Sequence, residues 1–123
     1  MHAHCVVCGA DHPGGLGLRF EPAPDGSGVR AVVPCEARFQ GYDGLLHGGV
    51  VSAVLDGAMA HCLFHLGRVG HTGSLEVRFR RPVLVGRRAD VRARLELSRG
   101  RVHLLRAELE QDGEIKVRAS AKF

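Results

Sequence analysis

The sequence is poor in aromatic residues, with no tryptophan, one tyrosine and five phenylalanines among 123 residues. Proteins that bind single-stranded nucleic acid rely on aromatic side chains that stack on bases, and no recognisable nucleic-acid-binding motif is present. We therefore expect at most weak, salt-sensitive contact with nucleic acid and no nucleic-acid partner.

Long apolar runs are also missing. The most apolar stretch, residues 50–66, is interrupted by Ser52, Asp56, His61 and His65, whereas a membrane-spanning helix needs roughly 18 or more apolar residues. The first residues lack the cationic segment and the long apolar segment of an export signal. We therefore expect a cytoplasmic protein with no membrane partner.

A complete metal-ligand set is absent as well. Without an export signal, free thiols are expected at all four cysteines, Cys5, Cys8, Cys35 and Cys62. Cys5 and Cys8 form half of a zinc-ribbon pattern to which His4 or His12 could add a ligand, but a second cysteine pair is missing. We favour a local turn whose cysteines pack as small apolar groups, and we predict no metal site.

Charge is divided unevenly along the chain. Residues 1–67 carry three arginines and six acids, net −3, whereas residues 68–123 carry twelve arginines, two lysines and seven acids, net +7. An anionic ligand is therefore expected to bind the second half. No linker or repeat is visible, so residues 1–123 are predicted to form a single domain, near the size at which oligomerisation adds stability.

Residues 50–66 predict a long helix in which Asp56 is the only acid. A helix that is apolar on all sides must be buried, so we expect a core helix that begins at the sequence His-Gly-Gly, residues 47–49. A lone carboxylate in such a helix costs several kcal/mol unless it is paired. Either Asp56 faces a polar edge and bonds the backbone there, or it does chemistry.

The two glycines at the helix start predict an oxyanion site. They leave the backbone N–H groups of Gly48 and Gly49 unblocked at the positive end of the helix dipole. Eight residues separate Gly48 from Asp56, about 12 Å along a helix, whereas a reacting carbonyl lies about 3 Å from both its donor and its attacker. Two antiparallel helices in a symmetric dimer bring these groups together, so we predict a composite site across a two-fold axis.

Alternating apolar and polar residues predict strands on both sides of the helix. A short first strand is expected at residues 16–20, and a second one, which contains Pro34, at residues 29–38. Four more strands are expected around residues 74–81, 91–97, 105–109 and 115–121. These patterns predict an α+β fold, with one antiparallel sheet of five or six strands and one helix on its apolar face.

Two segments carry a family resemblance. FQGYDGLLHGGVVSAVLDGAMAHC and GHTGSLEVRFRRPVLVG resemble the hotdog-fold acyl-CoA thioesterases of the phenylacetate-degradation and 4-hydroxybenzoyl-CoA type. The opening HCVVCGADHPGGLGLRF is similar to the cysteine-rich leader of that branch, with His12 where asparagine is usual. The likeness covers almost the whole chain and implies a hotdog fold, in which the sheet wraps around one long central helix.

The resemblance implies hydrolysis of an acyl-CoA thioester to free acid and coenzyme A by a dimer or a dimer of dimers, without a cofactor. It implies that the Gly48 N–H polarises the thioester carbonyl and that Asp56 is the general base or the nucleophile. His47 would shape the turn and lie near the carbonyl. A thioester is already activated, so a carboxylate and one oxyanion donor can suffice.

Two further positions follow from the resemblance. Thr72 stands where the family often has a serine or threonine that helps to hold the water. Gln40 falls near the position of a family asparagine or glutamine that contacts the substrate, although members usually carry an asparagine close to Gly41. Gln40 and Gly49 are therefore predicted to be substrate-binding residues.

Four arginines bracket the turn at residues 82–86, namely Arg80, Arg81, Arg87 and Arg88. As a cluster they could bind the phosphates of coenzyme A, because guanidinium groups form bidentate pairs with phosphate. The alternative is a solvated rim without a ligand.

Other functions remain open at this point. A hotdog hydratase or dehydratase would pair a histidine with the acid, but His47 followed by two glycines favours carbonyl polarisation. A non-catalytic acyl-CoA-binding module is a further alternative. Ser52 has no GxSxG setting and is expected to line the pocket or to bond its own helix. His61 and His65 are expected to be partly buried polar groups, because no acid completes a metal site.

Overall fold

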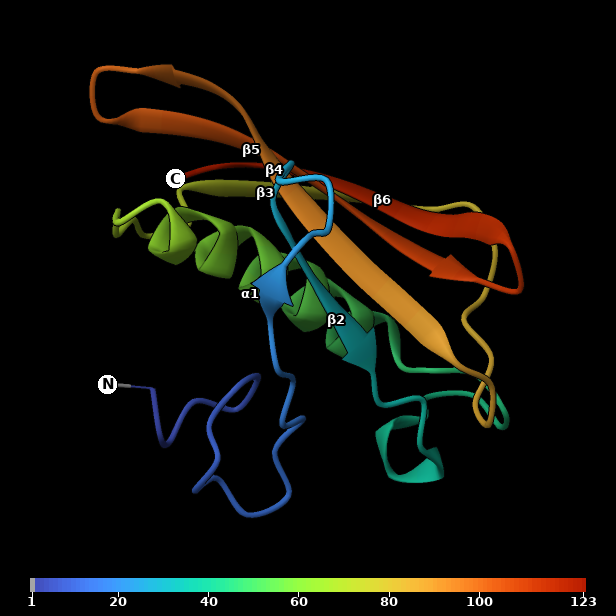
Figure 1. The fold of residues 1–123 in the computed structure, drawn as a ribbon. Helices are drawn as coiled ribbons and strands as arrows, with labels where there is room; N and C mark the ends of the chain where they lie inside the picture. The colour runs from blue at the N-terminus through green and yellow to red at the C-terminus, as the bar shows by residue number, and fades with distance from the viewer. Residues whose placement is uncertain (1) are drawn as a thin grey trace.

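A computed structural model describes residues 2–123, which form one long α-helix and one antiparallel sheet (Figure 1). The elements are β1 (Glu21–Pro22), β2 (Val29–Val33), the 3₁₀ turn η1 (Ala37–Phe39), α1 (Gly48–His65), β3 (Ser74–Phe79), β4 (Ala89–Arg99), β5 (Val102–Gln111) and β6 (Glu114–Lys122). Within residues 2–123 the strands lie in the order β1-β2-β4-β5-β6-β3, so β3 is an edge strand.

The strands follow the period-two pattern of the sequence. In β4, the side chains of Ala89, Val91 and Ala93 are buried while the alternate residues are exposed, because one sheet face packs on α1 and the other faces solvent. The β5–β6 turn places Asp112 (φ 56°) and Gly113 (φ 77°) in left-handed backbone conformations, as a two-residue hairpin loop requires. The β4–β5 hairpin projects past the end of α1 (Figure 1). The four strands predicted after the helix are therefore confirmed.

Helix α1 buries one face rather than its whole circumference. Its buried residues face the sheet: Val51, Val54, Leu55, Ala58, Met59, Cys62 and Leu63. The prediction of a helix buried on all sides is thus wrong for the single chain. A stripe of small or polar residues stays partly or fully accessible, and we call it the open flank: Gly49, Ser52, Ala53, Asp56 and Ala60. No helix in residues 2–123 is long and apolar enough to cross a membrane.

Residues 2–20, the leader, cover another side of α1, away from the sheet (Figure 1). The prediction of a strand at residues 16–20 is wrong, because the backbone N–H groups of Leu16 and Leu18 donate to the carbonyls of Val6 and Val7 within the leader. Val7 is buried on Gly57, where an added Cβ would lie 2.7 Å from a Val7 methyl group. The leader thus packs one residue away from Asp56.

Aromatic rings attach the leader to the second half of α1. The His61 ring stacks on Phe20 with centroids 4.4 Å apart and meets Phe64 edge-on at 5.2 Å, while His2 stacks on Phe64 at 4.7 Å. Within residues 2–123, the buried Nε2 atom of His61 has no hydrogen-bond partner. Burial lowers the pKa of His61, and the nearby His2 and His65 lower it further.

We expect the unfolding temperature to fall as the pH drops below about 6.5, the ordinary pKa of histidine. Because the folded state disfavours the charged imidazole, the unfolded chain binds the proton more readily, and acid removes stability. His61→Phe keeps the aromatic packing and removes the titrating group. Between pH 7 and pH 5 its unfolding temperature should therefore fall by several degrees less than that of wild type. Circular dichroism measures this, with the exposed His71→Phe as the control; equal falls in all three proteins would contradict the expectation.

Candidate active site

The start of α1 presents a free backbone donor at Gly48. His47 is the N-cap, with extended backbone angles (φ −61°, ψ 133°), and its Nδ1 atom accepts a 2.8 Å hydrogen bond from the N–H of Gly49. The N–H of Gly48 donates to no protein group in the described part of the chain. Of the two donors predicted to be unblocked, Gly49 is therefore occupied by the cap, and Gly48 is left to meet a ligand.

Asp56 lies on the open flank, two turns further along the helix. Its side chain is partly accessible, and its Oδ1 atom accepts a 2.6 Å hydrogen bond from the hydroxyl of Thr72, in the loop before β3. Among residues 2–123, Thr72 is its only hydrogen-bond donor. The structure thus brings Asp56 and Thr72 together and leaves Oδ2 available. Ser52 bonds its own helix, because its hydroxyl donates to the Gly48 carbonyl at 2.9 Å.

The loop before the helix engages Gln40 internally. The Oε1 atom of Gln40 accepts from the N–H of Gly44 at 3.2 Å, so this side chain stabilises the loop. Gly41 packs on the N-cap, where an added Cβ would lie 3.2 Å from Cδ2 of His47. A side chain at position 41 would therefore crowd His47, and no described contact joins Gln40 to Asp56.

A shallow hollow opens beside the helix start, and the sequence did not indicate its most accessible residue. Tyr42 is 85% exposed at this hollow. It is the only tyrosine in the chain and lies in the loop before the His-Gly-Gly turn, which is the signal that could have identified it. The hollow is lined by Gly41, Tyr42, Leu46, His47 and Gly48.

The four predicted arginines lie at the two ends of the loop formed by residues 80–88. This loop contacts the segment before the His-Gly-Gly turn, because the N–H of Leu46 donates a 2.8 Å hydrogen bond to the carbonyl of Val83. Arg80 forms no ion pair with any residue from 2 to 123. The other three form exposed ion pairs, Arg81 with Glu114 (3.4 Å), Arg87 with Asp112 (3.0 Å) and Arg88 with Asp90 (3.2 Å).

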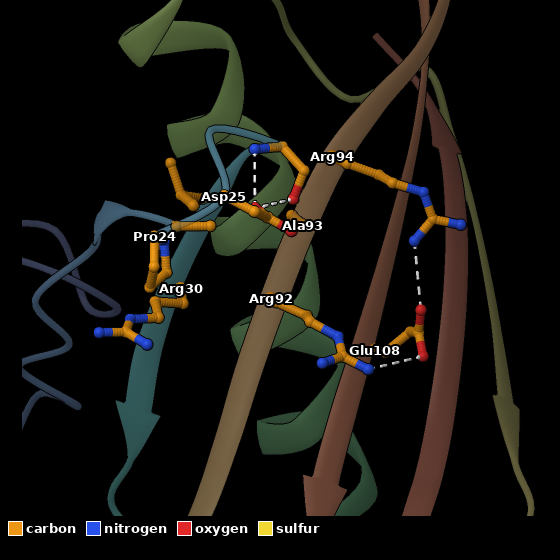
Figure 2. Close-up of a pocket in the computed structure, with 10 residues that line it drawn as sticks. Pro24, Asp25, Arg30, Arg92, Ala93, Arg94 and Glu108 are labelled. Carbon is orange, nitrogen blue, oxygen red and sulfur yellow. Dashed lines mark hydrogen bonds and ion pairs between the residues drawn. The ribbon is translucent and has the colours of Figure 1, made fainter.

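A larger hollow lies between the β1–β2 turn and the outer face of β4 (Figure 2). Its arginines are already paired: Arg94 reaches Glu108 at 3.2 Å, and Arg92 reaches Glu108 at 3.6 Å. Neither Gly48 nor Asp56 lines it. These charges are compensated, so we place the candidate site at the helix start and the open flank instead.

The leader cysteines lie in a tight turn, in which the N–H of Gly9 donates to the carbonyl of Cys5 at 2.8 Å. Cys5 and Cys8 are free thiols. Burial raises the pKa of Cys8 to about 11, and the hydrogen bond and charge of Cys5 add to this. No group of three or more possible metal ligands gathers anywhere from residue 2 to residue 123.

A sequence model of the thioesterase superfamily matches residues 43–117, more than half of the chain. The chain belongs to the thioesterase superfamily. The matched residues include the helix start, Asp56, Thr72 and loop 80–88. No curated protein sequence matches this chain.

Solved structures agree with this assignment and confirm the predicted hotdog fold. A crystal structure of another thioesterase superfamily protein superposes with a TM-score of 0.91 at 25% identity, covering 98% of this chain and 63% of that one. A phenylacetic acid degradation-related protein from Ralstonia eutropha JMP134 has a TM-score of 0.76 at 29% identity, covering 87% and 83%. The superfamily member described here thus spans less than two thirds of the first protein's length.

A more distant structure shares the fold alone. A Bacillus halodurans protein with CoA has a TM-score of 0.75 at 17% identity, covering 85% of this superfamily member and 71% of that chain.

Proposed function

We propose that this chain hydrolyses acyl-CoA thioesters to free acids and coenzyme A in an antiparallel dimer. The observation that carries the proposal is the pairing of a free Gly48 N–H at a helix start with an Asp56 carboxylate held by Thr72. Membership of the thioesterase superfamily supports the reaction class, and the Bacillus halodurans structure with CoA supports a ligand of this type.

A second copy is needed because the two groups lie on one helix, about 12 Å apart. The open flank supports such a copy, since small side chains let two helices approach closely. Strand β3 supports it too: it is an edge strand whose apolar residues remain accessible, with Phe79 51% and Leu75 39% exposed. An accessible apolar edge is a surface that a partner strand can complete.

The proposed chemistry divides the work between the two protomers. Asp56 removes a proton from water, the water oxygen attacks the thioester carbonyl, and the oxyanion forms against Gly48 of the partner subunit. The C–S bond then breaks, and the departing thiolate recovers the proton from Asp56. In the alternative route, the carboxylate itself attacks and water later hydrolyses the acyl-enzyme anhydride. Thr72 holds the carboxylate in either route.

The direct test is a panel of aliphatic and aromatic acyl-CoAs, assayed for release of free thiol. Hydrolysis of at least one class at an enzymatic rate supports the proposal. An enoyl-CoA in the same panel tests the hydratase alternative, because hydration removes the double bond without releasing thiol. Tight binding of acyl-CoA that leaves every thioester intact would identify a binding module and contradict the proposal.

We expect the arginines to bind the phosphates of coenzyme A. Arg80→Ala combined with Arg87→Ala should raise the Michaelis constant for acyl-CoA about tenfold, which corresponds to about 1.4 kcal/mol, with turnover within about twofold. Arg94→Ala, on the outer sheet face, is the matched control and should leave both constants unchanged. Saturation of the double variant at the concentration that saturates wild type would contradict this role.

A further inference from the structure

Gln111 is a buried polar residue at the end of β5, 1% exposed. Its Oε1 atom accepts from the N–H of Leu84 at 2.8 Å and from Nζ of Lys116 at 2.9 Å. Its Nε2 atom donates to the carbonyl of Leu84 at 2.9 Å and to that of Arg87 at 3.2 Å. One amide thus binds both backbone groups of Leu84, as a neighbouring strand would.

The loop that Gln111 holds is hydrogen-bonded in turn to the segment before the His-Gly-Gly turn, residues 47–49. The N–H of Leu46 donates to the carbonyl of Val83 at 2.8 Å, and the N–H of Val85 donates to the carbonyl of Gly44 at 2.9 Å. These two bonds lie on either side of Leu84, which forms an isolated β-bridge with Leu45. Leu46 directly precedes His47, the N-cap, so few bonds separate Gln111 from the helix start.

We propose that Gln111 is a positioning residue of the active site, whose amide fixes loop 80–88 and thereby the direction of the Gly48 N–H. Gln111 itself touches no reacting atom, and the inference rests on the proposed function of Gly48. Residues 80–88 contain no regular strand, so the amide supplies hydrogen bonds that a ladder would otherwise make. An oxyanion donor acts only when it is already aimed, and a displacement of about 1 Å can lower a rate about 10²-fold.

The test compares Gln111→Met with Lys116→Met. Gln111→Met keeps the length and volume of the side chain but loses every bond to the loop. Lys116→Met removes a buried cation, 5% exposed, yet leaves the bonds from Gln111 to Leu84 and Arg87 in place. We expect Gln111→Met to lower turnover about 10-fold to 100-fold with the Michaelis constant within about threefold, and Lys116→Met to keep turnover within about threefold.

Thermal unfolding of both variants separates positioning from stability. Turnover that falls in proportion to the lost unfolding temperature in both variants would assign Gln111 a purely structural role and overturn the proposal. If Gln111→Met does not fold, Gln111→Asn keeps the amide, shortens its reach by one methylene and gives the same readout.

A second measurement does not depend on catalysis. Amide hydrogen exchange followed by NMR should be faster at Leu46 and Val85 in the Gln111 variant and unchanged in Lys116→Met. Unchanged exchange in the Gln111 variant would overturn the proposal even if the enzyme is active. Faster exchange in a protein whose wild type hydrolyses no thioester would instead contradict the proposed function and leave the link from Gln111 to the helix start supported.

Discussion

Asp56→Asn is expected to lower thioester turnover about 10³-fold while the protein still folds and self-associates. Asparagine has nearly the same shape as aspartate and can still accept the hydrogen bond from Thr72, but it can neither remove a proton from water nor attack a carbonyl. Loss of a general base typically costs about 10²–10⁴ in rate. Thiol release from the preferred acyl-CoA measures the effect.

Asp43→Asn is the matched control, because Asp43 is an exposed acid in the loop before the helix. It should leave turnover within about twofold. The acyl-CoA panel is assayed with Asp56→Asn, Asp43→Asn and wild type, at equal amounts of folded protein checked by circular dichroism. If the Asp56 variant hydrolyses acyl-CoA as fast as wild type, the carboxylate takes no part in the reaction.

Gly48→Pro is expected to lower turnover about 10²–10³-fold, the typical cost of removing one oxyanion donor. Proline lacks the N–H, yet it suits the first position of a helix. The extended His47 backbone also matches what a residue before proline adopts. Gly48→Ala is the control: it keeps the N–H, and its added Cβ would lie 3.7 Å from Phe79, an ordinary contact. Gly48→Ala should therefore retain most of the activity.

Mixing the two inactive proteins tests the shared site. When Gly48→Pro and Asp56→Asn chains exchange in equal amounts, half of the dimers carry one chain of each kind. Each mixed dimer then has one site with both groups intact, so about a quarter of wild-type activity should return. If activity stays at the level of the separate variants after subunit exchange is verified, each site is built within one chain.

The four strands after the helix were predictable because each alternates apolar and polar residues, and the helix was predictable from its long apolar stretch after the His-Gly-Gly sequence. The strand predicted at residues 16–20 was wrong for a physical reason: Leu16 and Leu18 alternate with Gly17 and Arg19, but their backbone N–H groups donate to carbonyls of the leader rather than to a neighbouring strand. The full burial predicted for α1 was wrong because an apolar composition does not distinguish a surface covered within the chain from one left accessible.

The candidate site was predictable in part. The His-Gly-Gly turn and the isolated Asp56 stand out in the sequence, and the resemblance added Thr72, sixteen residues away, whose hydroxyl bonds the carboxylate. The occupation of the Gly49 N–H by His47 required the cap geometry. Gln111 could not be found, because its partners in loop 80–88 are backbone atoms 24 to 27 positions away, and side-chain patterns carry no information about such atoms.

The leader sets a limit on how copies of the chain can associate through α1. Residues 2–20 pack on one side of the helix and the sheet on another, so a single stripe remains for a neighbour. A single self-complementary stripe on α1 closes when two helices pair across a two-fold axis, whereas a second accessible stripe on the same helix allows further copies to add. A chain cut after Phe20 would expose Gly57, His61 and Phe64, and it would be expected to form larger assemblies than the intact chain.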